Sequence, residues 1–271
     1  MSIRPSRSWI ILVLAGVLAL SLVLVGCGKQ LSGSVSVGGS TTVQPLAQAL
    51  ADAFQQKHTD VGITVAGGGT AAGIKGANEG TFDIGAASRD LTTGDPALVT
   101  HLLAKDGIGI ITSPGNPVTG LTKAQVVSIF SGAITNWRDV GGPNHAIDVF
   151  VRESGSGTRT AFQELVMGSE NITSSALQQT SSGGIRQAVA GDPNAIGFES
   201  LAYLDSSIKA LDIDGVPATQ ETAKDGTYPI VRPLYFLTKE QPTGLVKDFI
   251  DFCQSVEGQQ IVEDNGYIAV K

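Results

Sequence analysis

Hydrophobic and polar positions along this chain follow two alternating periods. Residues 34–38 (SVSVG) alternate polar and apolar side chains, which predicts a strand, whereas residues 44–57 place apolar side chains at helical spacing. The same succession continues to the end of the chain. We expect further strands at 63–65, 82–84, 108–111, 147–151, 195–198, 230–231 and 234–237, and further helices at 71–79, 122–130, 160–167, 183–190 and 245–262. Strands that alternate with helices predict an α/β fold with a largely parallel sheet.

A cluster of turn residues, SPGNP at 113–117, directly follows the strand expected at 108–111. Such a cluster interrupts regular structure, so we expect the chain to cross between two lobes there. The length of 271 residues and the 42% hydrophobic content suit one large or two medium domains.

The first 26 residues have the pattern of an export signal. Arg4 and Arg7 precede an apolar run over residues 9–25, which is short for a stable membrane span. The sequence LVGC at 24–27 resembles a bacterial lipobox, in which Cys27 is lipidated and becomes the new N-terminus. The alternatives are a signal anchor, or a cleaved signal followed by an incidental cysteine. We expect a lipoprotein signal peptide at 1–26 and a lipid-anchored linker at 27–32. The protein is then anchored to the outer face of the cell membrane or lies within the periplasm.

Charge and cysteine content exclude two further classes of protein. Without the signal peptide the chain has 16 basic and 25 acidic residues, a net charge of −9, whereas nucleic-acid binders need a basic face. The other cysteine, Cys253, has no partner, so a disulfide framework is excluded. The negative charge does not exclude an anion receptor, because affinity comes from preorganised donors close to the ligand.

One local pattern occurs three times: a strand ends, a turn rich in glycine and hydroxyl side chains follows, and a helix begins. The turns are GGSTT at 38–42, GGGT at 67–70 and SGSGT at 154–158. A helix N-terminus has unpaired N–H groups and a partial positive charge, and it therefore binds anions readily. Arg152 could add a fork of charged hydrogen bonds. Ser and Thr also cap ordinary helices, so from the residues alone a small-oxyanion site and three ordinary caps both stay open.

The motifs of common enzymes are incomplete. The nucleophile elbow of hydrolases needs Gly-x-Ser-x-Gly, which is absent around Ser156. The stretch 68–75 imitates a P-loop, but Ile74 stands before Lys75 and breaks the motif. No cysteine and histidine cluster has zinc spacing. We expect no cofactor and no metal, and surface positions for the three histidines, His58, His101 and His145.

The motifs occur together in a known family. The stretches GGSTTVQP, GGGTAAGIKG, FDIGAASRD and RESGSGTRTAF, followed by AIGFESLAYL, KALDIDGV and YPIVRPLYF, resemble the PstS family. These are the extracytoplasmic phosphate receptors of bacterial high-affinity ABC importers. The resemblance covers essentially the whole mature chain. It implies a two-lobed class II periplasmic-binding-protein fold with the ligand between the lobes. The first lobe would comprise 33–112 plus 203–271, and the second lobe 113–202.

The resemblance also implies a set of phosphate-binding residues, carried over by motif. They are Ser40, Thr41, Thr42, Thr70, Ser88, Arg89, Arg152, Ser156, Gly157 and Thr158. Ser88 departs from the family pattern, because some members have an aspartate there that accepts the proton of hydrogen phosphate. Sulfate lacks that proton, so its rejection is less certain with a serine. Arg89 either adds charge to the site or pairs with Asp90 or Glu153.

The function that the resemblance implies is capture of inorganic phosphate and its delivery to a membrane permease driven by an ATPase. Such a receptor is a monomer, catalyses no reaction and is held at the membrane by its lipid. Three alternatives stay open. They are a receptor for sulfate, molybdate or tungstate, a surface signalling or adhesion module, and an exported phosphate-ester hydrolase.

Overall fold

The computed structural model describes residues 30–270. The expected signal peptide and Cys27 lie outside these residues. The strands are β1 (Gly33–Gly39), β2 (Val61–Ala66), β3 (Ile84–Ala87), β4 (Val99–Thr112), β5 (Gly120–Leu121), β6 (Asp148–Arg152), β7 (Leu177–Gln179), β8 (Ala195–Ser200), β9 (Lys209–Ala210), β10 (Asp212–Ile213) and β11 (Val231–Thr238). The helices are α2 (Gln44–Lys57), α3 (Thr70–Glu79), α4 (Lys123–Ser131), η1 (Trp137–Val140), α5 (Gly157–Phe162), η2 (Gln163–Met167), α6 (Ser182–Gly191), η3 (Leu201–Tyr203), α7 (Gln220–Lys224), α8 (Gly244–Cys253) and α9 (Val256–Asp264).

The main sheet is mixed, with parallel pairs at both ends and antiparallel pairs in its middle. Its strands follow the order β2-β1-β3-β11-β4-β8-β6-β7, and β9 pairs with β4. The pairs β1–β2, β1–β3, β6–β8 and β6–β7 are parallel, whereas β11 and β4 run antiparallel to their neighbours. The α/β fold is confirmed, but the sheet is less parallel than its strand–helix alternation predicted.

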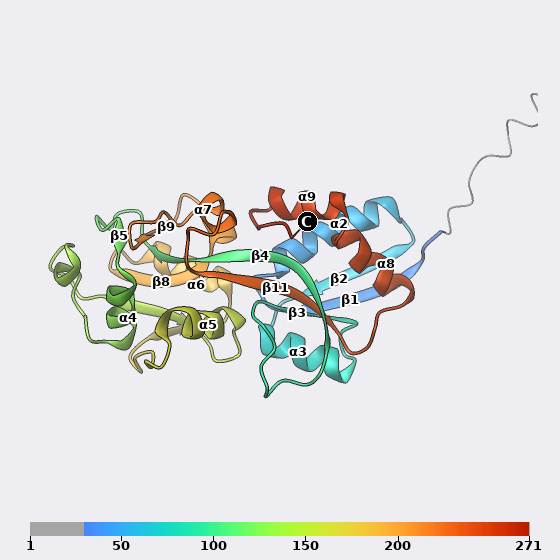
Figure 1. Cartoon of the computed structure of the whole chain (residues 1–271), viewed down its shortest axis with the longest axis horizontal. Coiled ribbons are helices and arrows are strands. Elements are labelled where there is room, and N and C mark those ends of the chain that lie inside the picture. The colour runs from blue at the N-terminus through green and yellow to red at the C-terminus, as the bar shows by residue number, and fades with distance from the viewer. Residues whose placement is uncertain (1–29, 271) are drawn as a thin grey trace, which may run out of the picture.

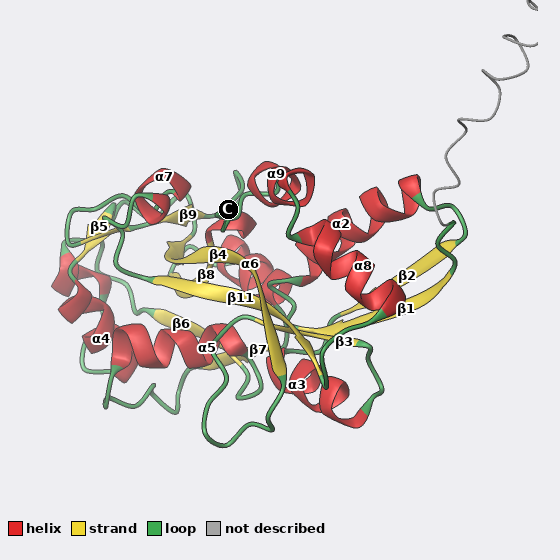
Figure 2. Ribbon diagram, turned by 45° about the vertical axis from the view of Figure 1, so that its right-hand side comes forward, coloured by secondary structure: helices red, strands yellow, loops and turns green. Residues whose placement is uncertain are grey.

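Two large apolar cores lie at the two ends of this sheet (Figure 1). One core is built from residues of 35–104 together with residues of 234–267, and the other from residues of 108–230 with Ile268. The long strands β4 and β11 run through both halves of the molecule (Figures 1 and 2). Within β4 the chain passes from one core to the other, between Ala104 and Ile108, whereas the lobe crossing at the turn 113–117 stays a prediction. Side chains of 211–230, a segment predicted for the first lobe, pack into the second core.

Most predicted elements are present, and the differences have local causes. Helix α2 has the predicted bounds, and Thr122 caps α4 with a reciprocal capping box. Strand β11 is continuous through Pro233, and its register shifts at the next residue pair, Leu234/Tyr235. The helix predicted at 245–262 is two helices, because Ser255 accepts the N–H of Gly258 and starts α9.

Two predicted strands have different bounds in the structure. Strand β4 begins at Val99, well before the apolar run at 108–111. Strand β3 starts at Ile84, so only the last residue of the run predicted at 82–84 belongs to it.

The helix predicted at 160–167 is an α-helical turn, α5, that continues as the π-helical segment η2. Among residues 30–270, no helix combines the length and the apolar character that a membrane crossing requires.

Candidate anion-binding site

The three glycine-rich turns meet, although they lie far apart in the sequence. Thr42 Oγ1 of the first turn lies 2.9 Å from Thr158 Oγ1 of the third. The N–H of Ala71, just after the second turn, donates to the carbonyl of Gly155 at 3.1 Å. Each turn follows the carboxyl end of a parallel strand, β1, β2 or β6. The three turns therefore converge at one place in the fold, as expected for turns at the carboxyl ends of strands.

The polar side chains of these turns are buried. Exposed fractions are 9% for Thr41 and 1–2% for the others, namely Ser40, Thr42, Thr70, Ser88, Arg152, Ser156 and Thr158. Burial of so many polar groups is costly unless each is hydrogen-bonded. This cluster is therefore built for polar contacts rather than for packing alone.

Four hydroxyl oxygens of the cluster each accept a hydrogen bond from a nitrogen donor. Thr41 Oγ1 accepts from the Ser182 N–H, Thr70 Oγ1 from the Ser88 N–H and Ser156 Oγ from the Arg159 N–H, at 3.2–3.3 Å. Thr158 Oγ1 accepts from Arg232 Nη1 at 2.7 Å. A hydroxyl has one proton and two lone pairs, so a bond that it accepts leaves its proton to be donated. The cluster can thus present several O–H donors to an acceptor.

Arg152 provides an unpaired charged donor in the same place. Its Nη1 donates to Ser182 Oγ at 3.1 Å, and its Nη2 to Glu153 Oε1 at 3.0 Å and to the Thr180 carbonyl at 3.3 Å. Among residues 30–270, its Nε has no hydrogen-bond partner, although the side chain is only 1% exposed. An anionic ligand would satisfy this donor.

Gly157 is closely packed against two hydroxyl groups, those of Thr70 and Ser88, which lie in the half of the molecule that contains β1–β3. A Cβ atom at this position would lie 2.4 Å from Thr70 Oγ1 and 2.7 Å from Ser88 Oγ. Ser88 Oγ itself lies 3.4 Å from Thr70 Oγ1. Only glycine lets the third turn approach Thr70 and Ser88 this closely.

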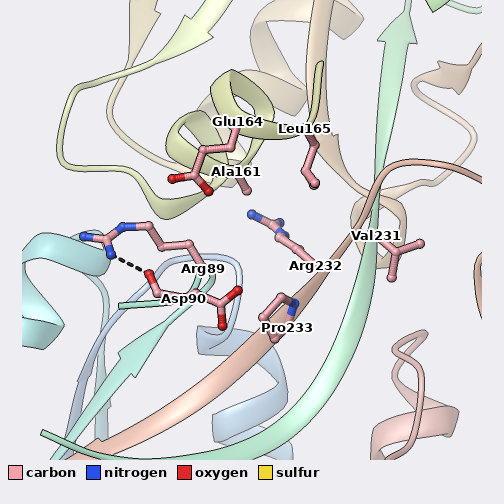
Figure 3. Close-up of a pocket in the computed structure, with 8 residues that line it drawn as sticks. All are labelled: Arg89, Asp90, Ala161, Glu164, Leu165, Val231, Arg232 and Pro233. Atoms are coloured by element: carbon pink, nitrogen blue, oxygen red, sulfur yellow. Dashed lines mark hydrogen bonds between the residues drawn. The ribbon is translucent and has the colours of Figure 1, made fainter. Parts of the chain in front are cut away.

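The structure does not bring Arg89 into the cluster. Both Nη atoms contact the Asp95 carboxylate, at 2.7 and 3.1 Å, and Nη1 also reaches the Asp90 carbonyl. In Figure 3 its guanidinium points away from Arg232, and the two residues line the same cavity, of about 80 Å³. The carboxylate that pairs with Arg89 is therefore that of Asp95. It is not that of Asp90 or of Glu153, the two partners considered from the sequence.

We expect Arg89→Gln to change stability rather than anion affinity. The hydrogen bond from Arg89 lowers the pKa of Asp95 from 3.8 to about 2. A lowered native pKa stabilises the fold above pH 4, and this contribution is lost as the pH falls toward 2. Urea unfolding should show Arg89→Gln less stable than the wild type at pH 7, with a smaller difference at pH 3. A phosphate Kd changed more than about threefold would instead place Arg89 in the site.

Comparison with known proteins shows the family of this chain. Residues 28–257 match the model of a PBP superfamily domain. The phosphate-binding protein PstS of Bacillus subtilis is 34% identical over 251 residues, which cover 89% of this chain and 82% of that protein. The chain belongs to the PstS family of phosphate-binding proteins.

Solved structures of relatives have the same fold. A phosphate ABC transporter substrate-binding protein of Clostridium perfringens, with bound phosphate, is 44% identical with a TM-score of 0.86, over 88% of this chain and all of that one. An ABC-type phosphate transport receptor of Vibrio cholerae is 34% identical with a TM-score of 0.72, over 86% of this chain and 99% of that one. The fold is therefore the α/β fold of periplasmic binding proteins.

Sequence reasoning missed several residues that surround the cluster. Ser182 starts α6 and contacts Thr41 and Thr42 through its hydroxyl, at 3.3 and 3.2 Å. A signal was present, because TSSGG at 180–184 has the same composition as the three turns. No comparable signal marks the two tyrosines that hold the first turn. Tyr203 donates to the Thr41 carbonyl at 2.6 Å, and Tyr267 to the Thr42 carbonyl at 2.8 Å.

Burial raises the pKa of these tyrosines and of a neighbouring glutamate. It raises the pKa of both tyrosine hydroxyls, Tyr203 and Tyr267, which therefore remain donors. It also raises the pKa of Glu199, which is fully buried, with Arg152 and Arg232 acting in the opposite direction. Over residues 30–270, no three His, Cys, Asp or Glu side chains are grouped so that they could hold a metal ion. The described contacts of the cluster are hydrogen bonds of hydroxyl, backbone and guanidinium groups.

Proposed function

We propose that this protein is an extracytoplasmic receptor that captures inorganic phosphate and delivers it to an ABC importer. The observation that carries the proposal is the unpaired Nε of buried Arg152 beside hydroxyls whose protons can be donated. The relatives named above are phosphate-binding and phosphate-transport proteins. The protein binds its ligand and transfers no chemical group, in line with these relatives.

The proposed ligand set follows from the contacts. Arg152 provides the charged bond, and the hydroxyls of Thr41, Thr70, Ser156 and Thr158 provide neutral donors. Ser40, Thr42, Ser88 and Gly157 line the same cluster and complete the proposed site. Arg89 is left out, since its guanidinium is paired with Asp95.

The positive charges of the site are already balanced by carboxylates. Arg152 pairs with Glu153, and Arg232 pairs with Asp106. The anion is therefore held mainly by oriented donors in a water-excluded place, where each donor is worth more than in water. Binding by oriented donors is therefore compatible with the overall negative charge of the protein.

The wider organisation of the receptor is also a proposal. We place the first lobe around the core at 35–104 and 234–267, and the second lobe around the core at 108–230, so that β4 and β11 form the crossings. Hinge closure about these strands would trap the anion. Lipidation of Cys27 would anchor a monomeric receptor outside the cytoplasm. Mass spectrometry of Cys27 in the membrane fraction tests the anchor.

Selectivity against sulfate is proposed to depend on Ser88. Ser88 Oγ lies 3.4 Å from Thr70 Oγ1, and a hydroxyl has two lone pairs, so it can accept the proton of hydrogen phosphate. Calorimetric titration of residues 28–271 with phosphate and with sulfate, at pH 6 and pH 8, tests the function. We expect tight phosphate binding without a sulfate signal. Equal affinity for both would make this a general oxyanion receptor, and no heat with either anion would refute the proposal.

Removing the Ser88 hydroxyl should lower that discrimination. Ser88→Ala is expected to weaken phosphate by about 1 kcal/mol, roughly fivefold, while sulfate binding, if any, stays unchanged. Competition titrations give the ratio of the two affinities. Ser207→Ala, on an exposed loop, is the matched control and should leave the ratio as it is.

A further inference from the structure

Asp106 and Arg232 form an ion pair in the middle of the sheet. They face each other in the antiparallel register of β4 and β11, the two strands shared by both halves of the molecule. Arg232 Nε and Nη2 donate to Asp106 Oδ2 at 3.1 and 2.8 Å, and both side chains are 1% exposed. Ser200 donates to the other carboxylate oxygen at 2.7 Å. A buried ion pair of this kind is no general aid to stability, so its retention here calls for another reason.

The remaining contacts of Arg232 lead into the anion-binding cluster. Its Nη1 donates to Thr158 Oγ1 at 2.7 Å and to the Ser88 carbonyl at 3.3 Å. Thr158 belongs to the half of the molecule that contains α5, whereas Ser88 follows β3 in the other half. One guanidinium thus joins the two central strands to a binding residue from each side.

The direction of the bond to Thr158 is fixed by chemistry. A guanidinium has only donors, so Thr158 Oγ1 must accept from Arg232. The proton of Thr158 is then available for donation, either to Thr42 Oγ1, which lies 2.9 Å away, or to a bound anion. A cavity of about 80 Å³ lies against the other side of Arg232 (Figure 3), so packing alone does not fix the guanidinium. The two bonds to Asp106 fix it instead.

We propose that Arg232, held by Asp106, is a positioning residue for phosphate binding that acts by orienting the hydroxyl of Thr158. Arg232 does not touch the anion in this scheme. It makes Thr158 a donor toward the anion and ties that donor to the strands about which the halves close. The inference rests on the proposed function and deepens it, because it gives the hydroxyl of Thr158 a donor role toward the proposed anion.

A thermodynamic cycle on the mature protein tests this inference, with phosphate as the titrant. The pair variant Asp106→Asn/Arg232→Gln removes both charges together, so no unpaired buried charge is left. Phosphate Kd is measured for the wild type, the pair variant, Thr158→Val, and the combination of all three substitutions. The pair substitution should weaken phosphate about tenfold in the wild type but less than about threefold when Thr158 is already valine. Thr158→Ser keeps the hydroxyl and should restore the full dependence on the pair.

Two controls keep the outcome decisive. The exposed pair Lys247 and Asp251 on α8, changed to Gln and Asn, should leave the phosphate Kd unchanged. If the pair variant does not fold, Arg232→Lys serves instead, since lysine keeps the charge beside Asp106 but cannot form the same fork of bonds. We expect it to fold and to bind phosphate at least fivefold more weakly.

The outcomes separate this inference from the proposed function. Equal effects of the pair substitution with and without the Thr158 hydroxyl would overturn the inference, as would full affinity in a folded Arg232→Lys protein. Absence of phosphate binding by the wild type would instead remove the proposed function itself.

Discussion

Replacing Arg152 with alanine is expected to weaken phosphate binding by more than about 2 kcal/mol, roughly thirtyfold in Kd. The side chain is 1% exposed, and its Nε has no partner among residues 30–270. A charged hydrogen bond to a ligand in such a place is strong, and its loss leaves the anion buried without that donor. Isothermal titration calorimetry with phosphate measures the change.

Two further variants separate the lost bond from indirect effects. Arg152→Ala also leaves Glu153 without its cation, so Arg152→Ala/Glu153→Gln shows how much of the loss comes from the unpaired carboxylate. Arg138→Ala removes an exposed arginine and should leave the Kd unchanged. An Arg152→Ala protein that binds phosphate as the wild type does would take Arg152 out of the site.

The parts of the site that could be predicted are those encoded by local pattern. The turns at 38–42, 67–70 and 154–158 can be recognised by their glycine and hydroxyl residues between a strand and a helix. Parallel strands then bring such turns to one edge of a sheet, so their convergence follows from the fold class. The burial of Thr41, Thr70 and Thr158 in one cluster agrees with that expectation.

The parts that could not be predicted depend on contacts between distant segments. Arg232 and Asp106 are 126 positions apart, and neither stands in one of the three glycine-rich turns. The first half of β4 was missed because His101, Lys105 and Asp106 interrupt its apolar pattern. Asp106 is tolerated there because Arg232 and Ser200 satisfy it. The sequence also gives no sign that one extended strand, β4, contributes side chains to both cores.

Hydrogen bonds between the two halves of the molecule explain why the cluster can respond to a ligand as a unit. Each half of the molecule contributes donors, and bonds between halves join Thr42 with Thr158 and Ala71 with Gly155. An anion that accepts from both sides would add to these bonds only when the halves are together. Its binding energy therefore favours the closed arrangement, as a population shift requires.

Gly157→Ala should uncouple the two halves and weaken phosphate by about 2–3 kcal/mol, roughly thirtyfold or more. The new Cβ would lie 2.4 Å from Thr70 Oγ1 and 2.7 Å from Ser88 Oγ, both on the opposite half. Neither oxygen can retreat without losing its bonds in the cluster, because Thr70 Oγ1 accepts the N–H of Ser88. Opening of the halves relieves the clash, so the unfolding temperature without phosphate should fall less than the affinity suggests.

Gly155→Ala is the matched control in the same turn. Its added Cβ would have Ala71 Cβ as nearest neighbour at 3.5 Å, an ordinary contact, so its phosphate Kd should stay within about threefold of the wild type. Calorimetry and thermal unfolding on both variants give the comparison. If Gly157→Ala bound phosphate as well as Gly155→Ala does, the close approach of the third turn to Thr70 and Ser88 would not be needed for binding. The anion would then be held within one half, and closure would have to be driven by other contacts.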